Sequence, residues 1–143
     1  MQPDPGAAGP PRPLPELDAW NRAFWTGGAG GRLLIARCGD CGYWIHPPGP
    51  ICPRCHSREV APQPVSGRGR LLTFTVNHQP WHPAFPPPYV IALVELEEQP
   101  LLRLVSNVVD CDPDSVRLGM PLEVRFEPVE DVHIPLFRPL AAG

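Results

Sequence analysis

Apolar and polar residues alternate along most of the chain from Arg68 onward, with the period of two that is typical of β-strands. The alternating apolar positions of four predicted strands are Leu72, Phe74 and Val76; Val90, Ala92, Val94 and Leu96; Leu102, Leu104 and Val108; and Leu122, Val124 and Phe126. Residues 132–138 can supply a short fifth strand. Five strands in about seventy residues favour a small closed barrel of the OB type, with an open sandwich as the alternative.

The first half of the chain shows helical spacing in one place only, at residues 15–25. Pro15 suits the first turn of a helix, and the pair Gly27-Gly28 ends it. The large apolar residues of this segment are Leu17, Trp20, Phe24 and Trp25. So short a helix can pack on its own domain or can bind a partner, and both interpretations stay open.

Two Cys-x-x-Cys knuckles, ten residues apart, follow this segment. Their members are Cys38, Cys41, Cys52 and Cys55. Short strands are expected at residues 32–37 and 43–46, on either side of the first knuckle. Two thiolates from one tight turn can reach the same ion, and four thiolates fill a tetrahedral zinc sphere with no position left for water. The spacing therefore predicts a structural zinc site, although iron can occupy four thiolates as well.

The alternatives for these cysteines have less support in the sequence. A redox Cys-x-x-Cys motif needs a βαβ pattern beside it, and none is visible. No secretory segment leads the sequence, which disfavours disulfides and favours the cytoplasm. Cys111 has no partner in sequence and is expected to be a half-buried residue without a chemical role.

Composition agrees with turns and short strands rather than long helices, because the chain holds 23 prolines and 13 glycines. We expect a Pro/Gly-rich disordered arm or linker at residues 1–14, a helix with a zinc ribbon at 15–65, and the barrel at 66–139. The net charge is −3, and residues 66–143 alone carry −4. An acidic barrel argues against a surface that binds polyanions. No stretch is long and apolar enough to span a membrane.

Two further features point to contacts outside the chain. The predicted strand at residues 89–96 is apolar on both faces, so its outer face needs a cover from the ribbon, the helix or another protein. The loop at residues 77–89 contains Trp81 and Phe85 among five prolines, and a stiff loop presents an aromatic side chain at a low entropic cost. Trp81 can equally fold back onto the barrel.

Four segments together resemble a known family: FWTGGAGGRLLIARCGDCG, HPPGPICPRCHS, PYVIALVELEE and LGMPLEVRFEP. They look like the acyl-CoA-associated zinc-ribbon/OB-fold proteins, long catalogued as a domain of unknown function, over roughly residues 20–139. The resemblance implies a mainly β fold, in which an N-terminal helix and a rubredoxin-like ribbon precede a five-stranded OB barrel. It also implies structural zinc on the four cysteines. One departure is Gln99-Pro100, where the family usually places a glycine.

The same resemblance implies a non-catalytic accessory subunit of a thiolase-superfamily enzyme that acts on acyl-CoA thioesters. One branch of the family partners lipid-transfer-type retro-aldolases in steroid side-chain degradation, and some members are joined to hot-dog-fold hydratases. The expected partner contacts are Trp20, Phe24, Trp25, Trp81 and Phe85. Candidates for contact with the CoA phosphates are Arg32, Arg37, Arg68 and Arg70, since guanidinium favours phosphate.

No catalytic residue is predicted, because the sequence has no nucleophile elbow, HExxH motif or phosphate-binding glycine loop. Asp131 and His133 lie two apart on a strand and can point the same way, which does not by itself make a catalytic dyad. The alternative function is a single-stranded nucleic-acid-binding OB module, which would need a basic groove with stacking aromatics. A hydrolase or lyase with its own active site is the third hypothesis.

Overall fold

The computed structural model describes residues 12–141. The elements before the barrel are α1 (Arg22–Thr26), the 3₁₀ turn η1 (Gly27–Gly30), β1 (Leu33–Cys38), β2 (Trp44–Ile45) and β3 (Val60–Val65). The elements of the barrel are β4 (Arg68–Asn77), β5 (Tyr89–Leu96), β6 (Arg103–Val108), the 3₁₀ turn η2 (Pro113–Ser115), β7 (Pro121–Val129) and β8 (Val132–Pro139). Most of the predicted arm, residues 1–11, lies outside the described residues.

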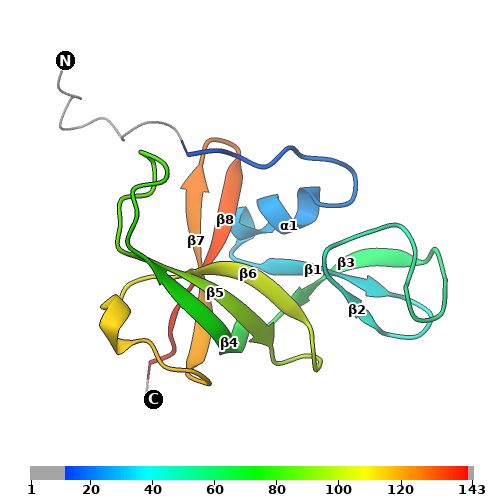
Figure 1. The fold of residues 1–143 in the computed structure, drawn as a ribbon. Coiled ribbons are helices and arrows are strands. Elements are labelled where there is room, and N and C mark those ends of the chain that lie inside the picture. The colour runs from blue at the N-terminus through cyan, green and yellow to red at the C-terminus, as the bar shows by residue number, and fades with distance from the viewer. Residues whose placement is uncertain (1–11, 142–143) are drawn as a thin grey trace.

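Strands β4 to β8 form a closed barrel in the order β4-β5-β6-β8-β7 (Figure 1). The barrel is closed where β4 pairs with β7, in the register Gly69↔Leu122. The predicted mainly β fold with a five-stranded OB barrel is thereby confirmed, and the open sandwich is excluded. Gly69 lies where a Cβ atom would come within 2.3 Å of the Glu95 carbonyl oxygen, so this crossing requires glycine.

Strand β4 differs from the predicted alternation at its start. A bulge between Leu71 and Thr73 turns Leu71 into the core, where it is 1% exposed, and leaves Leu72 half-buried. Phe74 and Val76 pack against the core as expected. An inserted residue shifts the two-residue period by one, which the sequence pattern alone does not reveal.

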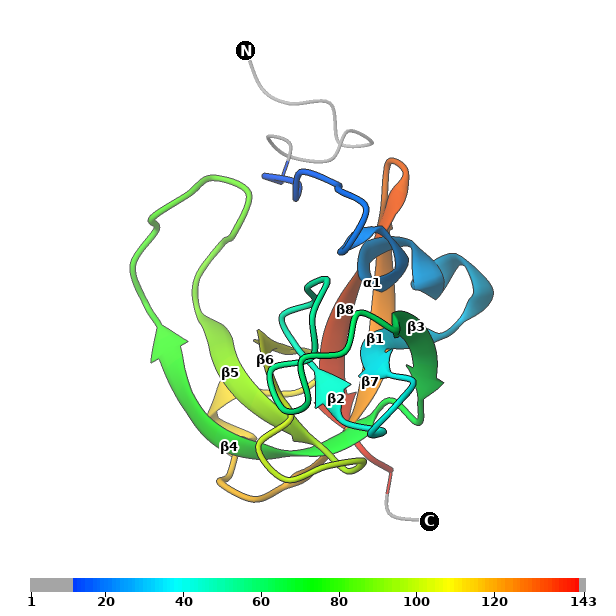
Figure 2. The ribbon, with the colours of Figure 1, turned by 90° about the vertical axis from the view of Figure 1, so that its right-hand side faces the viewer.

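The three strands β2-β1-β3 form a separate antiparallel sheet that projects from one side of the barrel (Figures 1 and 2). Strand β3 was not expected, because Pro62 and Pro64 interrupt it. The Gly39 N–H donates to the Glu59 carbonyl at 2.6 Å, and hydrogen-bonded pairs alternate from there along β1 and β3. Pro62 and Pro64 therefore face the outer edge, where their missing N–H groups cost no ladder hydrogen bond. Leu33, Ile35 and Trp44 of this sheet belong to the same core cluster as the barrel residues. The ribbon and the barrel therefore share one hydrophobic core.

The predicted helix is shorter than expected, since it begins at Arg22 and not near Pro15. The Asp18 carboxylate accepts hydrogen bonds from the backbone N–H groups of Trp20 and Asn21, both at 2.8 Å. The Asp18 carbonyl also accepts a hydrogen bond from the Arg22 N–H at 3.2 Å, so this Asx-type turn leads into α1 and leaves the residues before Asp18 outside the helix. The helix ends at Thr26, as the two glycines predicted, and the chain continues into η1.

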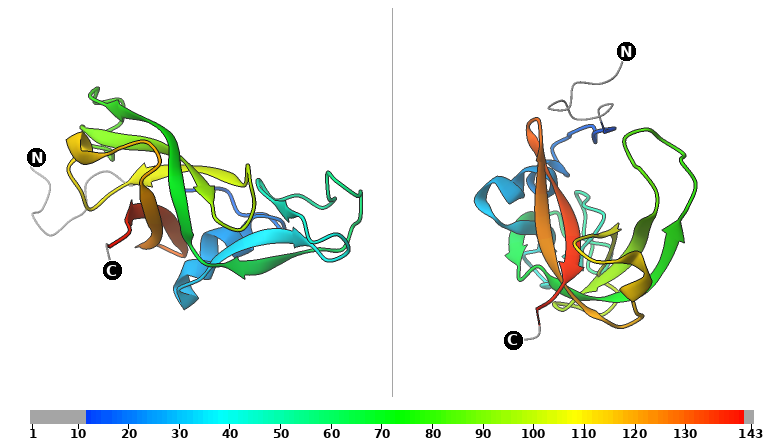
Figure 3. Two further views of the ribbon diagram at one scale, coloured as in Figure 1. Left: turned by 90° about the horizontal axis from the view of Figure 1, so that it is seen from below. Right: turned by 90° about the vertical axis from the view of Figure 1, so that its left-hand side faces the viewer.

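Helix α1 and the segment before it lie along the outer face of β8 (Figures 1 and 3). Leu14, Leu17 and Trp25 pack there against a cluster of buried β8 side chains. The buried members of this cluster are Val132, Ile134 and Leu136. Gly28 is in such close contact that a Cβ atom would lie 2.5 Å from atoms of both Phe126 and His133. Residues 14–17 and the helix thus cover one outer face of the barrel.

Candidate metal centre and apolar groove

The four knuckle cysteines meet at the tip of the ribbon. Their Sγ atoms all lie within 4.8 Å of one another, with Cys38–Cys55 at 3.5 Å and Cys41–Cys52 at 3.6 Å. Tetrahedral Zn–S bonds of about 2.3 Å would place sulfurs about 3.8 Å apart. Among residues 12–141 this is the one group of His, Cys, Asp or Glu side chains close enough to hold an ion.

Both knuckles use the same backbone turn. The N–H of Gly42 donates to the Cys38 carbonyl at 3.0 Å, and the N–H of His56 donates to the Cys52 carbonyl at 2.9 Å. Both residues have a positive φ, 79° for Gly42 and 64° for His56. A left-handed residue that closes each turn points the two cysteines of the knuckle to one side. His56 therefore has a backbone role, which its side chain did not suggest.

The polar environment of the cysteines favours thiolates, but not four at once. The N–H of Cys41 lowers the pKa of the Cys38 thiol to about 6. The N–H of Ser57 acts in the same direction on Cys55, but the neighbouring Cys38 thiol and burial raise the pKa of Cys55 to about 12. Four ionised thiols at this spacing need a cation between them, so the donor set fits a divalent metal.

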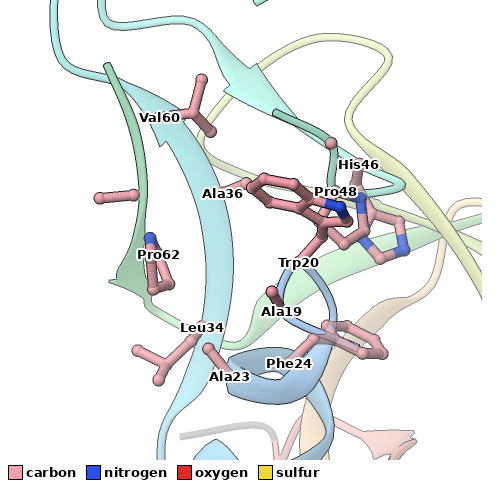
Figure 4. A pocket seen from close by; sticks show the side chains of 12 residues that line it. Ala19, Trp20, Ala23, Phe24, Leu34, Ala36, His46, Pro48, Val60 and Pro62 are labelled. Atoms are coloured by element: carbon pink, nitrogen blue, oxygen red, sulfur yellow. The ribbon is translucent and has the colours of Figure 1, made fainter. Parts of the chain in front are cut away.

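The aromatic side chains predicted to bind a partner divide into two groups. Phe24 and Trp25 are half-buried and pack on the barrel, with their rings 4.9 Å apart at 84°. Trp20 is 54% exposed and lies across a pocket between α1 and β1, beside Ala36 (Figure 4). His46 lines the same pocket and contacts Phe24, at 4.9 Å between ring centroids. Burial lowers the pKa of His46, so it is neutral at pH 7.

The loop between β4 and β5 holds its tryptophan away from the barrel. Trp81 is 76% exposed, and its Nε1 donates to the Asn77 Oδ1 at 2.9 Å. Phe85 is half-buried and packs near the His82 and Tyr89 rings, and the Arg12 guanidinium lies 5.1 Å from its ring centre. Of the two expectations for Trp81, the structure favours presentation over folding back.

The four candidate arginines do not form one cluster of free guanidinium groups. Arg37 lies over the Trp44 ring at 4.5 Å and donates to the Gly42 carbonyl. Arg70 pairs with Glu95 at 3.0 Å. Arg32 and Arg68 are exposed, and neither forms an ion pair within residues 12–141. Two of the four are therefore engaged inside the chain.

An apolar groove of about 710 Å³ separates α1 and the ribbon from the outer face of β5 and β6. Phe24, Trp25 and Pro48 form one wall, and Leu93, Leu101 and Val105 form the other. Leu101 is 71% exposed and Val105 is 73% exposed. The groove continues past Ile91 into a second hollow of about 290 Å³ beside β8. The outer face of β5, predicted to need a cover, is thus rimmed by the helix and ribbon but left open.

Gln99 joins the ribbon to the barrel, a role that the sequence pattern did not indicate. The Gln99 side chain accepts a hydrogen bond from the Trp44 N–H at 2.9 Å and donates one to the Trp44 carbonyl at 3.0 Å. It joins the β5–β6 turn to the ribbon across 55 residues of chain. The family usually places a glycine at this turn, and its replacement by Gln99-Pro100 was the feature of the sequence that could have indicated this contact.

None of the helices in the part of the chain that the structure describes has the length and apolar character needed to cross a membrane.

Comparison with known proteins gives consistent matches over the ribbon and the barrel. Residues 25–61 match the rubredoxin-like zinc ribbon domain of ChsH2, and residues 62–127 match its C-terminal OB-fold domain. A solved structure titled Ltp2-ChsH2(DUF35) aldolase superposes with a TM-score of 0.77 and 42% identity. That match covers 88% of this chain and 98% of the other.

Relatives of known sequence differ in length. The chain is 43% identical over 130 residues to a probable enoyl-CoA hydratase alpha subunit of Thermomonospora curvata, a match to 90% of this chain but 40% of that protein. It is 38% identical over 103 residues to the 3-oxo-4,17-pregnadiene-20-carboxyl-CoA hydratase alpha subunit of Mycobacterium tuberculosis, which covers 72% of this chain and 32% of that protein. A DUF35 domain-containing scaffold protein of Methanocaldococcus jannaschii is 37% identical over 101 residues, with 69% of this chain and 70% of that protein covered. The chain thus spans less than half of the two hydratase subunits, and it belongs to the DUF35 family of ChsH2-type zinc-ribbon/OB-fold proteins.

Proposed function

We propose that this protein is a non-catalytic accessory subunit that binds and activates a thiolase-superfamily enzyme acting on acyl-CoA thioesters. The observation that carries the proposal is the match of the fold, at 42% identity, to 98% of a chain in the structure of the Ltp2-ChsH2(DUF35) aldolase. The open apolar groove and the exposed Trp20 and Trp81 support it, because exposed apolar surface of this extent marks interaction sites.

The metal in this proposal is zinc with a structural role, held by Cys38, Cys41, Cys52 and Cys55. Four thiolates leave no open position for water or substrate, so the ion would hold the ribbon tip together and take no part in chemistry. The tip has few other sources of stability. Its buried cluster contains only Cys38, Ile45 and Cys52, with three partly buried neighbours.

The substrate class is proposed from the relatives. Two of them are named as subunits of hydratases for CoA thioesters, and one of those substrates is a steroid CoA ester. Together with the aldolase named in the matching structure, this supports a partner that is a retro-aldolase of the lipid-transfer type, with steroid side-chain degradation as the pathway and a hot-dog-fold hydratase domain upstream as a further partner. Arg32 and Arg68 are the arginines free to meet CoA phosphates that are shared with the partner.

A tagged chain recovered from native cell extract, with mass spectrometry of the associated proteins, tests the proposal. A thiolase-superfamily enzyme in near-stoichiometric amount is the expected result, followed by a rise in its acyl-CoA cleavage rate when the purified chain is added. Recovery of the chain alone, or with nucleic acid, would overturn the accessory role. The Cys111→Ser variant serves as a control, because Cys111 lies outside both the metal centre and the groove.

A further inference from the structure

Strand β6 has one edge that the barrel leaves largely unpaired. Its other edge pairs with β5 along its whole length, from Arg103 to Val108. Toward β8 the ladder consists of a single pair, Val108↔Phe137. Beyond that pair β6 runs away from β8 toward the ribbon (Figure 1).

Pro135 removes one hydrogen bond at the point where this ladder stops. In the register of Val108 with Phe137, the next residue of β8 to donate would be Pro135, and its acceptor would be the Val105 carbonyl. Proline has no N–H group, so the hydrogen bond cannot form. The Ser106 hydroxyl donates to the Pro135 carbonyl at 2.8 Å instead, from a side chain and not from the backbone.

The direction of the free backbone groups follows from the pairing with β5. The Leu96 N–H donates to the Leu102 carbonyl at 2.8 Å, and hydrogen-bonded residues of an antiparallel pair alternate from there. Leu102 and Leu104 therefore turn their backbone groups toward β5. Arg103 and Val105 turn theirs away from it, toward the unpaired edge.

The apolar groove, defined above by Phe24, Trp25, Pro48, Leu93, Leu101 and Val105, lies beside this edge. Three of the seven exposed large apolar residues among residues 12–141 line the groove or its extension: Ile91, Leu101 and Val105. A free backbone edge next to exposed apolar side chains is the combination that an added β-strand recognises, since the edge binds the backbone and the groove binds alternate side chains.

The positive charge of Arg103 beside the groove indicates which kind of peptide segment the groove would bind. Arg103 is exposed at its rim and forms no ion pair with any residue from 12 to 141. Glu95 lies opposite Arg103 on β5, but the Leu101 N–H and Arg70, at 3.0 Å each, lower its pKa more than the charge of Arg103 does. Asp18 lines the same groove, and its carboxylate already accepts hydrogen bonds from the Trp20 and Asn21 N–H groups. A carboxylate from outside the chain would complement Arg103.

We infer that the free edge of β6 binds an extended segment of the partner enzyme, which adds as a strand beside Arg103–Val105. The segment places apolar side chains in the groove at alternate positions and an acidic side chain near Arg103. This inference rests on the proposed function for the identity of the partner, and it specifies how and where the partner docks.

The Val105→Pro substitution tests the inference. It removes the outward N–H of Val105 while the hydrogen bonds between β5 and β6 are kept, because position 105 does not donate to β5. Val105→Ala is the matched control, since it removes apolar side-chain contact but keeps the N–H. With the thiolase-superfamily partner identified by mass spectrometry, we expect Val105→Pro to raise the Kd at least tenfold above that of Val105→Ala.

A second measurement covers the case in which Val105→Pro fails to fold. Hydrogen exchange of the wild-type chain should slow at the Val105 amide when the partner is added. Equal Kd values for a folded Val105→Pro and Val105→Ala, or unchanged exchange at Val105 in the complex, would refute strand addition while the accessory role stands. If no thiolase-superfamily partner binds at all, the proposed function fails first. Protection of Val105 by free CoA or by a second copy of the chain would also count against the inference.

Discussion

The Gln99→Ala substitution offers a quantitative test of how the ribbon is held on the barrel. It removes both hydrogen bonds to Trp44, a residue that is 8% exposed. Each neutral hydrogen bond contributes about 1 kcal/mol net, and an unsatisfied buried group costs about 1–3 kcal/mol. Gln99 is itself half-buried, so water can reach part of the gap. We expect the free energy of unfolding to fall by about 2 kcal/mol.

The assay is equilibrium unfolding of the metal-loaded chain in urea, followed by tryptophan fluorescence. In a thermal scan the same loss corresponds to a Tm lower by about 6 °C for a domain of this size. Gln99→Glu should be at least as unstable, because it keeps an acceptor for the Trp44 N–H but sets a carboxylate oxygen against the Trp44 carbonyl. Gln79→Ala is the matched control, since Gln79 is exposed. A loss below about 0.5 kcal/mol for Gln99→Ala, equal to a typical surface substitution, would refute the role of Gln99 as a junction.

Three further outcomes are expected. Cys41→Ser should lose the bound metal and lower the Tm sharply, because structural zinc is worth roughly 10–16 kcal/mol in finger peptides. Cys111→Ser should change neither the metal content nor the Tm, as zinc quantification and a thermal scan would show. Gly28→Ala should lower the free energy of unfolding by about 1–3 kcal/mol through overpacking against Phe126 and His133, and Gly30→Ala, where a Cβ atom meets open space, should be near neutral. His46 has a lowered pKa in the folded chain, so the unfolded chain takes up more protons below about pH 6.5, and stability falls as the pH decreases through this range. His46→Gln should show a smaller decrease in Tm between pH 7 and pH 5 than the wild type; an identical decrease would contradict the contribution of His46.

Local patterns in the sequence predicted the parts of the fold whose cause is local. Strand alternation in β5 placed Val90, Ala92 and Val94 in the core, where each is at most 2% exposed. The knuckle spacing placed the four cysteines together. Strand β3 was not predicted, because Pro62 and Pro64 argue against a strand in any position except a sheet edge. Its place at the edge of the ribbon sheet is seen only in the structure. The bulge at Leu71 and the junction at Gln99 depend on partners far along the chain, which no local pattern encodes.

The helical pattern at residues 15–25 also predicted less than the structure shows. Of its apolar face, Leu17 and Phe24 pack on the chain, which is one of the two interpretations that the sequence left open, and the helix has only five residues after the Asx turn at Asp18. Two of the three aromatic residues of the predicted segment, Phe24 and Trp25, pack on the barrel, and the third, Trp20, does not. Trp25 fills the outer face of β8, while Trp20 stays more than half exposed. A helix pattern alone does not divide residues between these two roles, because the division depends on which barrel face the helix meets.

Two strands of the barrel, β5 and β8, are apolar on both faces, but only the outer face of β8 is covered by another segment of the chain. The outer residues of β8, Ile134 and Leu136, are buried by Leu14, Leu17 and Trp25. On β5, Ile91 is 37% exposed, and Leu93 lines an open groove. The chain thus covers one of these faces with its own segment and leaves the other open, beside the largely unpaired edge of β6. An uncovered apolar face next to a free strand edge is typical of a surface that binds another protein. The burial of one face and the exposure of the other together favour an accessory subunit over a self-contained module.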